Sequence, residues 1–260
     1  TINKFTRAGE YNLSAGLNTK IYGLVQFKKG KIKAIRHVVT PNLSFSYRPD
    51  FADERYGYYK NVELENGNSQ EYSIMQNGIF GSPSKGKQGN IILNISNILE
   101  TKINSKKDTI NTTKKIKILE NLNIGSSYNI FADSLNLNDI NLNARTRFLD
   151  VIDLNVSSRY DPYITNKSFN DNVNKFELFE NGRLARFTNA NATIGLAISN
   201  NTFIKNKDNN KKPKVNWSLN ANYAVTYNKG YRSSVFSDTT QSLNFSGDIK
   251  ITDKWKFNFQ

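Results

Sequence analysis

The sequence has no cysteine, one histidine, one methionine and two tryptophans. Without cysteine it can form neither disulfide bonds nor thiolate metal sites. A lone histidine, His37, cannot build a histidine-based metal site, so we expect a structural or interfacial role for it. Asp150 and Asp153 flank a predicted turn, and turn chemistry explains them more simply than a catalytic carboxylate pair. We therefore expect no catalytic residue, no metal and no cofactor.

Long apolar runs are missing as well. No stretch reaches the length of a transmembrane helix, and no signal peptide is visible. The chain begins at Thr1 and ends in the strand-like residues 255–259. We expect both ends to be cut from something longer, so the missing signal peptide excludes no location.

The composition is polar but rich in aromatic residues. Hydrophobic residues make up only 37% of the chain, and the mean hydropathy is -0.60. Aromatic residues nevertheless reach 12%, with 13 tyrosines and 16 phenylalanines, which argues against disorder. This combination is typical of a β-protein in which one face of each strand is exposed to water.

The net charge is +14 at pH 7, and the pI is about 9.7. Such a balance is compatible with nucleic acid, acidic membrane surfaces or phosphorylated glycolipid as partners. The lysines gather in predicted turns, which is more typical of solvated loop tips than of binding sites; they include 28–31, 106–107, 114–115 and 211–212. The aromatic and basic residues form no RNP-type sheet motif, so we expect no nucleic acid partner.

The stretch GSPSKGKQGN, residues 81–90, is similar to a phosphate-binding loop. That motif needs a hydroxyl residue after its lysine, to bind Mg²⁺, and a helix immediately downstream. Here Gln88 follows Lys87, and residues 91–96 alternate as a strand. We expect a loop that leads into a strand and not a nucleotide site.

Alternation of apolar and polar residues dominates the chain. One such pattern runs from Tyr11 to Phe27, whereas ordinary strands have about 5–6 residues. Similar patterns predict about ten strands and no helix. The predicted strands lie near 11–27, 35–47, from 91 onward, and at 118–128, 140–148, 152–160, 184–198, 215–227, 243–251 and 255–259.

The predicted connections differ in length at the two ends of the strands. Connections within strand pairs are mostly short: they are 28–31, 149–151 and 252–253, and two somewhat longer ones lie near 103–115 and 200–213. Connections between one pair and the next are mostly long: they are 49–89, 161–183 and 229–240. The connection 131–138 is the exception, because it joins two pairs but is short. This segregation is typical of an outer-membrane barrel, in which one strand face meets lipid and the other a wet lumen. The alternative is a soluble sandwich with the aromatics in its core, against which the polar face argues because it is rich in Asn and Ser. We therefore predict an all-β fold, an antiparallel transmembrane β-barrel with short turns at one end and long loops at the other.

Five arginines lie at the alternate positions that form the polar side of their predicted strands: Arg36, Arg48, Arg145, Arg147 and Arg159. In a barrel they point inward, and arginine binds phosphate and carboxylate in a bidentate manner. One interpretation is that they are lumen-facing contacts for an anionic substrate. The other is that they pair with lumenal Asp or Glu or line a filled interior.

Several stretches resemble the barrel of the LptD family, lipopolysaccharide-assembly proteins of the outer membrane that are also called organic solvent tolerance protein OstA. The likeness covers roughly residues 10–200 and is carried by KIYGLVQFKKGKIKAIRHVVTPNLSFSYRPDF (20–51), YGYY (56–59), NGIFGSPSKGKQGNIILNISNILETKI (77–103), NLNIGSSYNIFADSLNLNDINLNARTRFLD (121–150), DPY (161–163) and GRLARF (182–187). The resemblance implies a non-enzymatic translocon of the Gram-negative outer membrane that inserts lipopolysaccharide (LPS) into the outer leaflet. It further implies a periplasmic LPS-transport bridge, a lipoprotein plug similar to LptE, a hydrophilic lumen and a lateral gate.

The resemblance also bears on the extent of the fragment. The family barrel is far larger than ten strands, and the family's jellyroll domain is not visible here. We therefore expect residues 1–260 to be a single segment of the barrel wall, incomplete and without a second domain. Two other functions stay open: a different outer-membrane barrel for solute uptake, either a porin or a plugged receptor, and a secreted soluble β-protein that binds polyanions.

Overall fold

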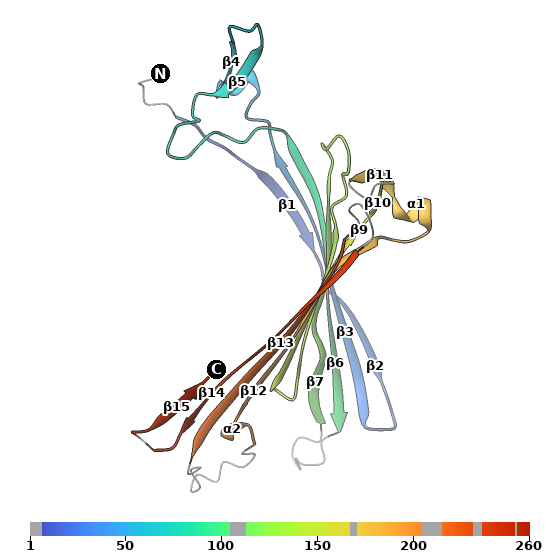
Figure 1. Ribbon diagram of the computed structural model, residues 1–260. Coiled ribbons are helices and arrows are strands. Elements are labelled where there is room, and N and C mark those ends of the chain that lie inside the picture. The colour runs from blue at the N-terminus through green and yellow to red at the C-terminus, as the bar shows by residue number, and fades with distance from the viewer. Residues whose placement is uncertain (1–6, 105–112, 167–170, 204–214, 231–235, 253) are drawn as a thin grey trace. The chain divides into compact units, whose positions relative to one another are not determined.

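The computed structural model describes residues 7–104, 113–166, 171–203, 215–230, 236–252 and 254–260 (Figure 1). Nearly all of its regular structure is strand. The main sheet contains β1 Leu13–Asn18, β2 Ile21–Gln26, β3 Ile32–Arg48, β6 Gln88–Asn104, β7 Thr113–Asn129, β8 Ile140–Phe148, β9 Ile152–Asp161, β12 Arg186–Ser199, β13 Asn216–Gly230, β14 Phe236–Lys250 and β15 Lys256–Phe259. Among the described residues no helix has the length and apolar character that crossing a membrane requires.

The strands follow one another in the order β1-β3-β6-β7-β8-β9-β12-β13-β14-β15, and β2 also pairs with β3. The prediction of a single strand over 11–27 is wrong in detail, because β1 and β2 lie one after the other along β3. Pro41 explains the break: Thr19 N donates to its carbonyl at 3.3 Å, but proline has no N–H to return. Together, β1 and β2 correspond to the single strand that was predicted over 11–27.

The sheet does not close on itself within the described part of the chain, where no pairing joins β14 or β15 to β1 or β2. The pairings that define its register are antiparallel. The predicted antiparallel all-β fold of about ten strands is thus confirmed.

The chain divides into two compact units. The smaller one consists of residues 1–17, 42–93 and 127–138, and the larger one of 18–41, 94–126 and 139–260. Strands β1, β3, β6 and β7 contribute residues to both.

The smaller unit contains the long connection between β3 and β6. This connection folds into a 3-10 turn (η1, Glu54–Tyr56) and a hairpin of β4 (Tyr59–Glu63) and β5 (Ser69–Ser73). Its core is aromatic: Phe51 is fully buried, and its ring centroid lies 5.6 Å from that of Tyr11 and 5.0 Å from that of Tyr56. The predicted loop 49–89 is therefore an ordered structure with its own core.

The stretch 81–90 is a loop that leads into β6, as predicted. Arg48 donates to the carbonyls of Lys85 and Gly86 at 3.2 and 3.0 Å, and Gly86 N donates to Asp50 Oδ1 at 2.8 Å. Gly86 has a φ of 85°, a left-handed conformation that favours glycine. The backbone of residues 85–86 is therefore held by side chains of the same unit, Arg48 and Asp50.

The larger unit contains the connection between β9 and β12. It forms β10 (Tyr163–Thr165), β11 (Asn172–Phe176) and helix α1 (Glu177–Asn181), and a second short helix, α2 (Asn200–Phe203), follows β12. The expectation of no helix is therefore wrong for these two short pieces. Neither has the length over which a 3.6-residue hydrophobic period can be read from a sequence.

Other loop predictions hold in part. The turns 27–31 and 149–151 are short, with Leu149 and Asp150 at φ values of 53° and 61°. The predicted long loop 229–240 is wrong: β13 extends to Gly230 and β14 begins at Phe236. These strand ends are polar on both faces, so they carry no alternation.

Some predictions lie outside the described residues. They concern the lysines at 106–107 and 211–212, most of the loops 103–115 and 200–213, and residue 253 of the turn 252–253.

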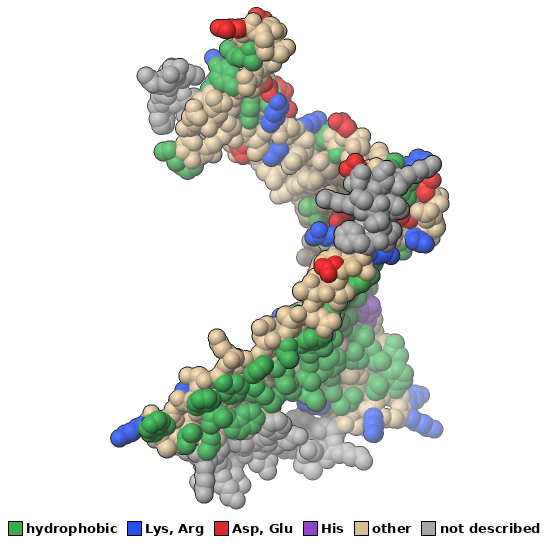
Figure 2. Space-filling view, viewed as in Figure 1, with side chains coloured by type: hydrophobic (Ala, Val, Ile, Leu, Met, Phe, Trp, Pro, Cys, Tyr) green, Lys and Arg blue, Asp and Glu red, His purple; other side chains and the backbone are tan. Residues whose placement is uncertain are grey.

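Strand register gives the larger unit two distinct faces. One face, here called the apolar face, carries rows such as Thr146, Leu154, Ile194, Tyr223 and Leu243, each residue paired with the next. Large side chains on it are exposed, with Ile194 at 45% and Leu243 at 64%. In Figure 2 hydrophobic side chains form a broad band over the strands of this unit, with lysine and arginine beyond it. A surface of this kind is a membrane or protein contact and not the outside of a soluble sheet.

Candidate functional site

The polar face of the larger unit is the opposite side of the same strands. Its rows are built from small polar residues, for example Asn143, Ser157, Asn191 and Thr226 across β8, β9, β12 and β13. Side chains bind one another across the strands: Asn189 Nδ2 donates to Asn228 Oδ1 at 2.6 Å, and Asn191 Nδ2 donates to Thr226 Oγ1 at 2.7 Å. Alternation places these residues on one face because successive side chains of a strand point to opposite sides.

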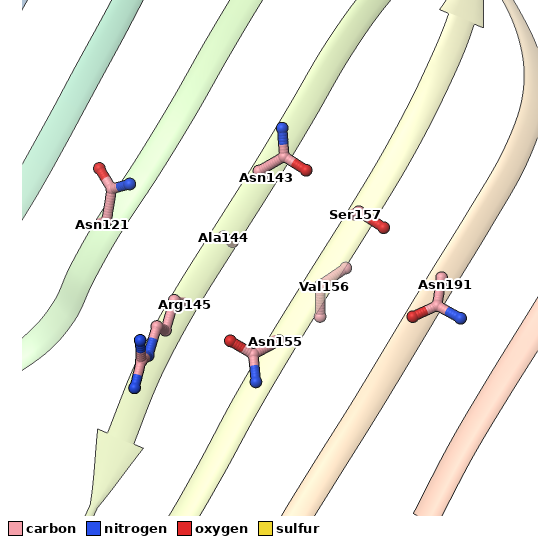
Figure 3. Close-up of a pocket in the computed structure, with 8 residues that line it drawn as sticks. All are labelled: Asn121, Asn143, Ala144, Arg145, Asn155, Val156, Ser157 and Asn191. Carbon is pink, nitrogen blue, oxygen red and sulfur yellow. The ribbon is translucent and has the colours of Figure 1, made fainter.

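A shallow hollow of about 180 Å³ lies on the polar face where β7, β8, β9 and β12 run side by side (Figure 3). Asparagine amides from each of these strands surround it, together with one guanidinium. The lining residues are Asn121, Asn143, Ala144, Arg145, Asn155, Val156, Ser157 and Asn191. Each amide offers both donors and an acceptor, so the hollow presents hydrogen-bonding groups of both kinds.

Arg145 and Arg147 converge on one carboxylate near the β8–β9 turn. Arg147 Nε and Nη2 donate to the two oxygens of Asp153 at 2.7 and 2.9 Å, a bidentate pair. Arg145 lies 3.7 Å from Asp153 and 3.8 Å from Glu120. The interpretation of Asp153 as a turn residue is therefore wrong, because its side chain faces the neighbouring strand. Register decides this, since Asp153 is directly opposite Arg147.

Two further predicted arginines of this unit also have carboxylate partners. Arg36 donates from Nε and Nη2 to Glu100 Oε2 at 2.9 and 2.5 Å. Arg159 Nε lies 3.8 Å from Asp139 Oδ2. Burial raises the pKa of the Asp139 carboxyl above its ordinary value, and the nearby charge of Asp161 acts in the same direction.

The five predicted arginines do not form one cluster. Arg145 and Arg147 lie together, whereas Arg36 and Arg159 each pair with a separate carboxylate. Arg48 belongs to the smaller unit and holds the loop 85–86 by its backbone carbonyls. Among the described residues no group of three or more His, Cys, Asp or Glu is placed to hold a metal ion.

A comparison with protein families identifies the chain's relatives. The family described as LptD protein matches residues 1–163, more than half of the chain. The chain belongs to the LptD protein family. Comparisons with curated proteins and with solved structures gave no match. At the family level this membership means transport and assembly of LPS at the outer membrane by a transport protein and not by an enzyme.

Hydrogen bonds that replace bonds to water contribute about 0.5–1.5 kcal/mol each, so the asparagines of the polar face offer many weak hydrogen-bonding positions. The paired arginines add positive groups without leaving a large uncompensated charge.

One polar pair on the apolar face was not predicted. His37 Nε2 lies 3.1 Å from Asn97 Oδ1, and Asn97 Nδ2 donates to the carbonyl of Leu122 at 3.3 Å. The structural role expected for His37 fits this contact, which joins β3 to β6 and, through Asn97, to β7. The sequence shows one sign of this pair, because Asn97 is a polar residue among the alternate positions that form the apolar side of its strand. The partner of Asn97 depends on strand order, which the sequence does not give.

Proposed function

We propose that this chain forms part of the wall of an outer-membrane barrel that delivers LPS to the outer leaflet. The apolar face contacts membrane lipid, and the polar face lines a hydrophilic lumen for the sugars of LPS. Delivery involves no covalent chemistry: LPS arrives from a periplasmic bridge and leaves through a lateral gate between strands, and an LptE-like lipoprotein fills the lumen.

The observation that supports this most is the two-faced sheet of an LptD-family chain. Exposed Ile, Leu, Phe and Tyr cover one face, and Asn, Ser and Thr cover the other. A soluble β-protein buries its apolar face, whereas a membrane barrel turns it to lipid. The secreted soluble alternative is therefore disfavoured.

We also propose that Arg36, Arg48, Arg145, Arg147 and Arg159 contact anionic groups of the passing ligand. The carboxylate partners of Arg36, Arg145, Arg147 and Arg159 support this role, because a phosphate or carboxylate oxygen can take the place of Asp153 or Glu100 at the same guanidinium. Arg48 is included for its position on the polar side of its strand alone, since its partners are backbone carbonyls. Exchange of one anion for another leaves no arginine unpaired during passage.

The test is depletion of the full-length parent protein in its native cell, followed by labelling of surface LPS. Loss of surface LPS with LPS accumulating inside the cell is the expected result. Unchanged surface LPS together with reduced uptake of small solutes would instead support a porin or a plugged receptor.

A further inference from the structure

We propose that the apolar face binds anionic glycerophospholipids at its short-turn rim, the strand end that carries the β2–β3 and β8–β9 turns. Lys33 and Lys114 bind the phosphate of the headgroup, and Phe27 packs against the start of the acyl chains. The inference rests on the proposed function, because it takes the apolar face as the lipid-facing side of a barrel wall. It goes beyond that function by naming a lipid that is not the transported cargo.

The two lysines lie on the apolar face of the larger unit. Lys33 belongs to β3 and Lys114 to β7. The residues that follow them, Ala34 and Lys115, line a small hollow on the polar face together with Arg36. Successive side chains of a strand point to opposite sides, so Lys33 and Lys114 face the apolar side. Both strands therefore begin their apolar side with a lysine.

The next residues on the same side are apolar. Ile35, two residues after Lys33, lies opposite Val25 in the β2–β3 register, and Val25 is 56% exposed. Ile116, two residues after Lys114, is 38% exposed. Each lysine thus stands at the edge of an apolar strip. A lysine is suited to this place, because its hydrocarbon stem covers apolar surface while its ammonium group reaches polar surroundings.

An aromatic ring accompanies the first lysine. Phe27 N donates to the carbonyl of Lys33 at 2.8 Å, which continues the register of Val25 with Ile35 and places both side chains on one face. The Phe27 side chain is 42% exposed. Girdles of aromatic residues mark the two edges of the apolar band of outer-membrane barrels. Phe27 and Lys33 therefore place a ring and a cation together at the level of lipid headgroups.

The charge at this part of the rim is positive. Within the part of the chain that the structure describes, neither Lys33 nor Lys114 forms an ion pair. The β2–β3 turn adds three exposed lysines, Lys28, Lys29 and Lys31. A concentration of like charge raises the local concentration of a ligand of opposite charge. The turn lysines attract the headgroup, and the two lysines of the apolar face bind it.

The β8–β9 turn at the same rim has the apolar part without the cations. Phe148 lies opposite Ile152 on the apolar face and is 45% exposed. The turn that follows contains Leu149 and Asp150 and no lysine. The positive charge is therefore a local feature of the rim near β2, β3 and β7. A general need for soluble turns does not explain this difference, whereas a binding role does.

These features favour an anionic glycerophospholipid over other ligands. A free phosphate ion gains nothing from Phe27 and the apolar strips. An acidic protein would have to approach a surface that the proposed function places in the bilayer. LPS enters the opposite leaflet, because outer-membrane barrels keep their short turns on the periplasmic side. A phospholipid of the periplasmic leaflet presents both a phosphate and acyl chains at this rim.

Retention of lipid by the purified full-length parent protein in non-ionic detergent tests the proposal. The probes are phosphatidylglycerol, zwitterionic phosphatidylethanolamine with the same acyl chains, and bisphosphorylated lipid A, each quantified by native mass spectrometry. The double variant Lys33→Gln/Lys114→Gln should retain about tenfold less phosphatidylglycerol, because each lysine contributes on the order of fivefold near an anionic lipid surface. Its retention of phosphatidylethanolamine should change by less than about twofold, since that headgroup has no net charge.

A matched control removes the same charge from the other face at the same rim. Lys102 and Lys115 line the hollow on the polar face. Lys102→Gln/Lys115→Gln should retain phosphatidylglycerol within about twofold, because these charges do not face the lipid. Equal losses in the two double variants, or no loss in Lys33→Gln/Lys114→Gln, would overturn the proposal. A loss confined to lipid A would overturn the choice of a glycerophospholipid.

A third variant tests the contact with the acyl chains. Phe27→Ser leaves every charge in place and should lower retention of phosphatidylglycerol by at least about threefold, because apolar contact area is lost. Unchanged retention would contradict the apolar part of the site. Heat-modifiable migration in detergent gels shows that each variant is folded.

Depletion in cells is an independent readout. If depletion abolishes surface LPS while Lys33→Gln/Lys114→Gln retains phosphatidylglycerol normally, the proposed function stands and this site does not. If surface LPS is unchanged on depletion while the double variant loses phosphatidylglycerol, the site stands and the proposed function does not.

Discussion

At the scale of single residues, burial separates the ion pairs into two kinds. Arg147 and Asp153 on the polar face have side chains 42% and 30% exposed, so solvent screens their attraction. Arg186 and Asp161 are only 8% and 9% exposed and are 2.6 Å apart, with Glu177 4.0 Å from the same guanidinium. Only the second group leaves an unpaired buried charge when one member is removed.

We expect Arg186→Gln to destabilise the connection between β9 and β12. The change leaves Asp161 and Glu177 buried without their cation, and breaking a buried pair costs about 3–5 kcal/mol. Arg186 also donates from Nε to the carbonyl of Tyr163 at 3.2 Å, so the start of β10 loses a partner too. A denaturant titration in detergent, with limited proteolysis of residues 162–185 as the local readout, measures the effect.

Arg183→Gln is the control for this prediction. Arg183 lies in the same connection but is exposed, so the same substitution should change the unfolding free energy by less than about 0.5 kcal/mol. If Arg186→Gln and Arg183→Gln were equally stable and equally resistant to protease, the buried cluster would have no structural role.

At the scale of elements, long strands allow neighbouring side chains to face different environments. Register runs without interruption from Asn216–Lys250 to Gly230–Phe236 between β13 and β14. A slip of one residue would move every apolar side chain to the polar face, so the register is strongly specified. Leu219 and Asn220 are adjacent in β13 and lie on opposite faces.

We expect Leu219→Arg to reduce the free energy of unfolding by about 2–4 kcal/mol if it lies near the bilayer midplane, because the charge is placed in lipid. Asn220→Ser on the other face should be mild, since the new hydroxyl still hydrogen-bonds with water or with the lumenal network. Unfolding of the chain reconstituted in lipid vesicles measures both. Similar stabilities for the two variants would show that the assignment of faces is wrong.

At the scale of the whole molecule, the larger unit displays an amphipathic sheet, and its connections differ in length, although β13 and β14, at the same strand end as the long connection from β9 to β12, are joined by residues 231–235 only. The turns β2–β3 and β8–β9 are short, whereas the connection from β9 to β12 contains two strands and a helix. Outer-membrane barrels keep short turns on the periplasmic side and long loops outside. The absence of cysteine makes this topology directly measurable.

Single cysteines should therefore react with a membrane-impermeant maleimide according to their strand end. Glu180→Cys, in α1, should be labelled in intact cells, because α1 belongs to a long connection. Lys29→Cys, in the β2–β3 turn, should be labelled only after the outer membrane is permeabilised. Both positions are exposed, so accessibility on the protein itself does not separate them. Labelling of both in intact cells would reject the proposed orientation.

Local alternation in the sequence determined most of the fold. Period-2 patterns specify which residues share a face of a strand, and they identified most strands of the main sheet and two short turns, but not the small strands β4, β5, β10 and β11. The interpretation of 81–90 as a loop that leads into a strand was correct for the same reason, because the residues that follow it alternate. Where strands become polar on both faces, as at 226–230 and 236–242, this signal vanishes, and the expected loop 229–240 was wrong.

Strand order and three-dimensional packing decided the rest. No pattern in the sequence tells which carboxylate meets Arg36 or Arg147, since Glu100 and Asp153 become partners only through register. The break at Thr19 depends on Pro41 in another strand, and the buried cluster of Arg186 depends on a connection folding back on β12. Alternation is a property of one strand and can be read from it, whereas partners, hollows and buried charges belong to neighbouring strands, which only the tertiary structure brings together.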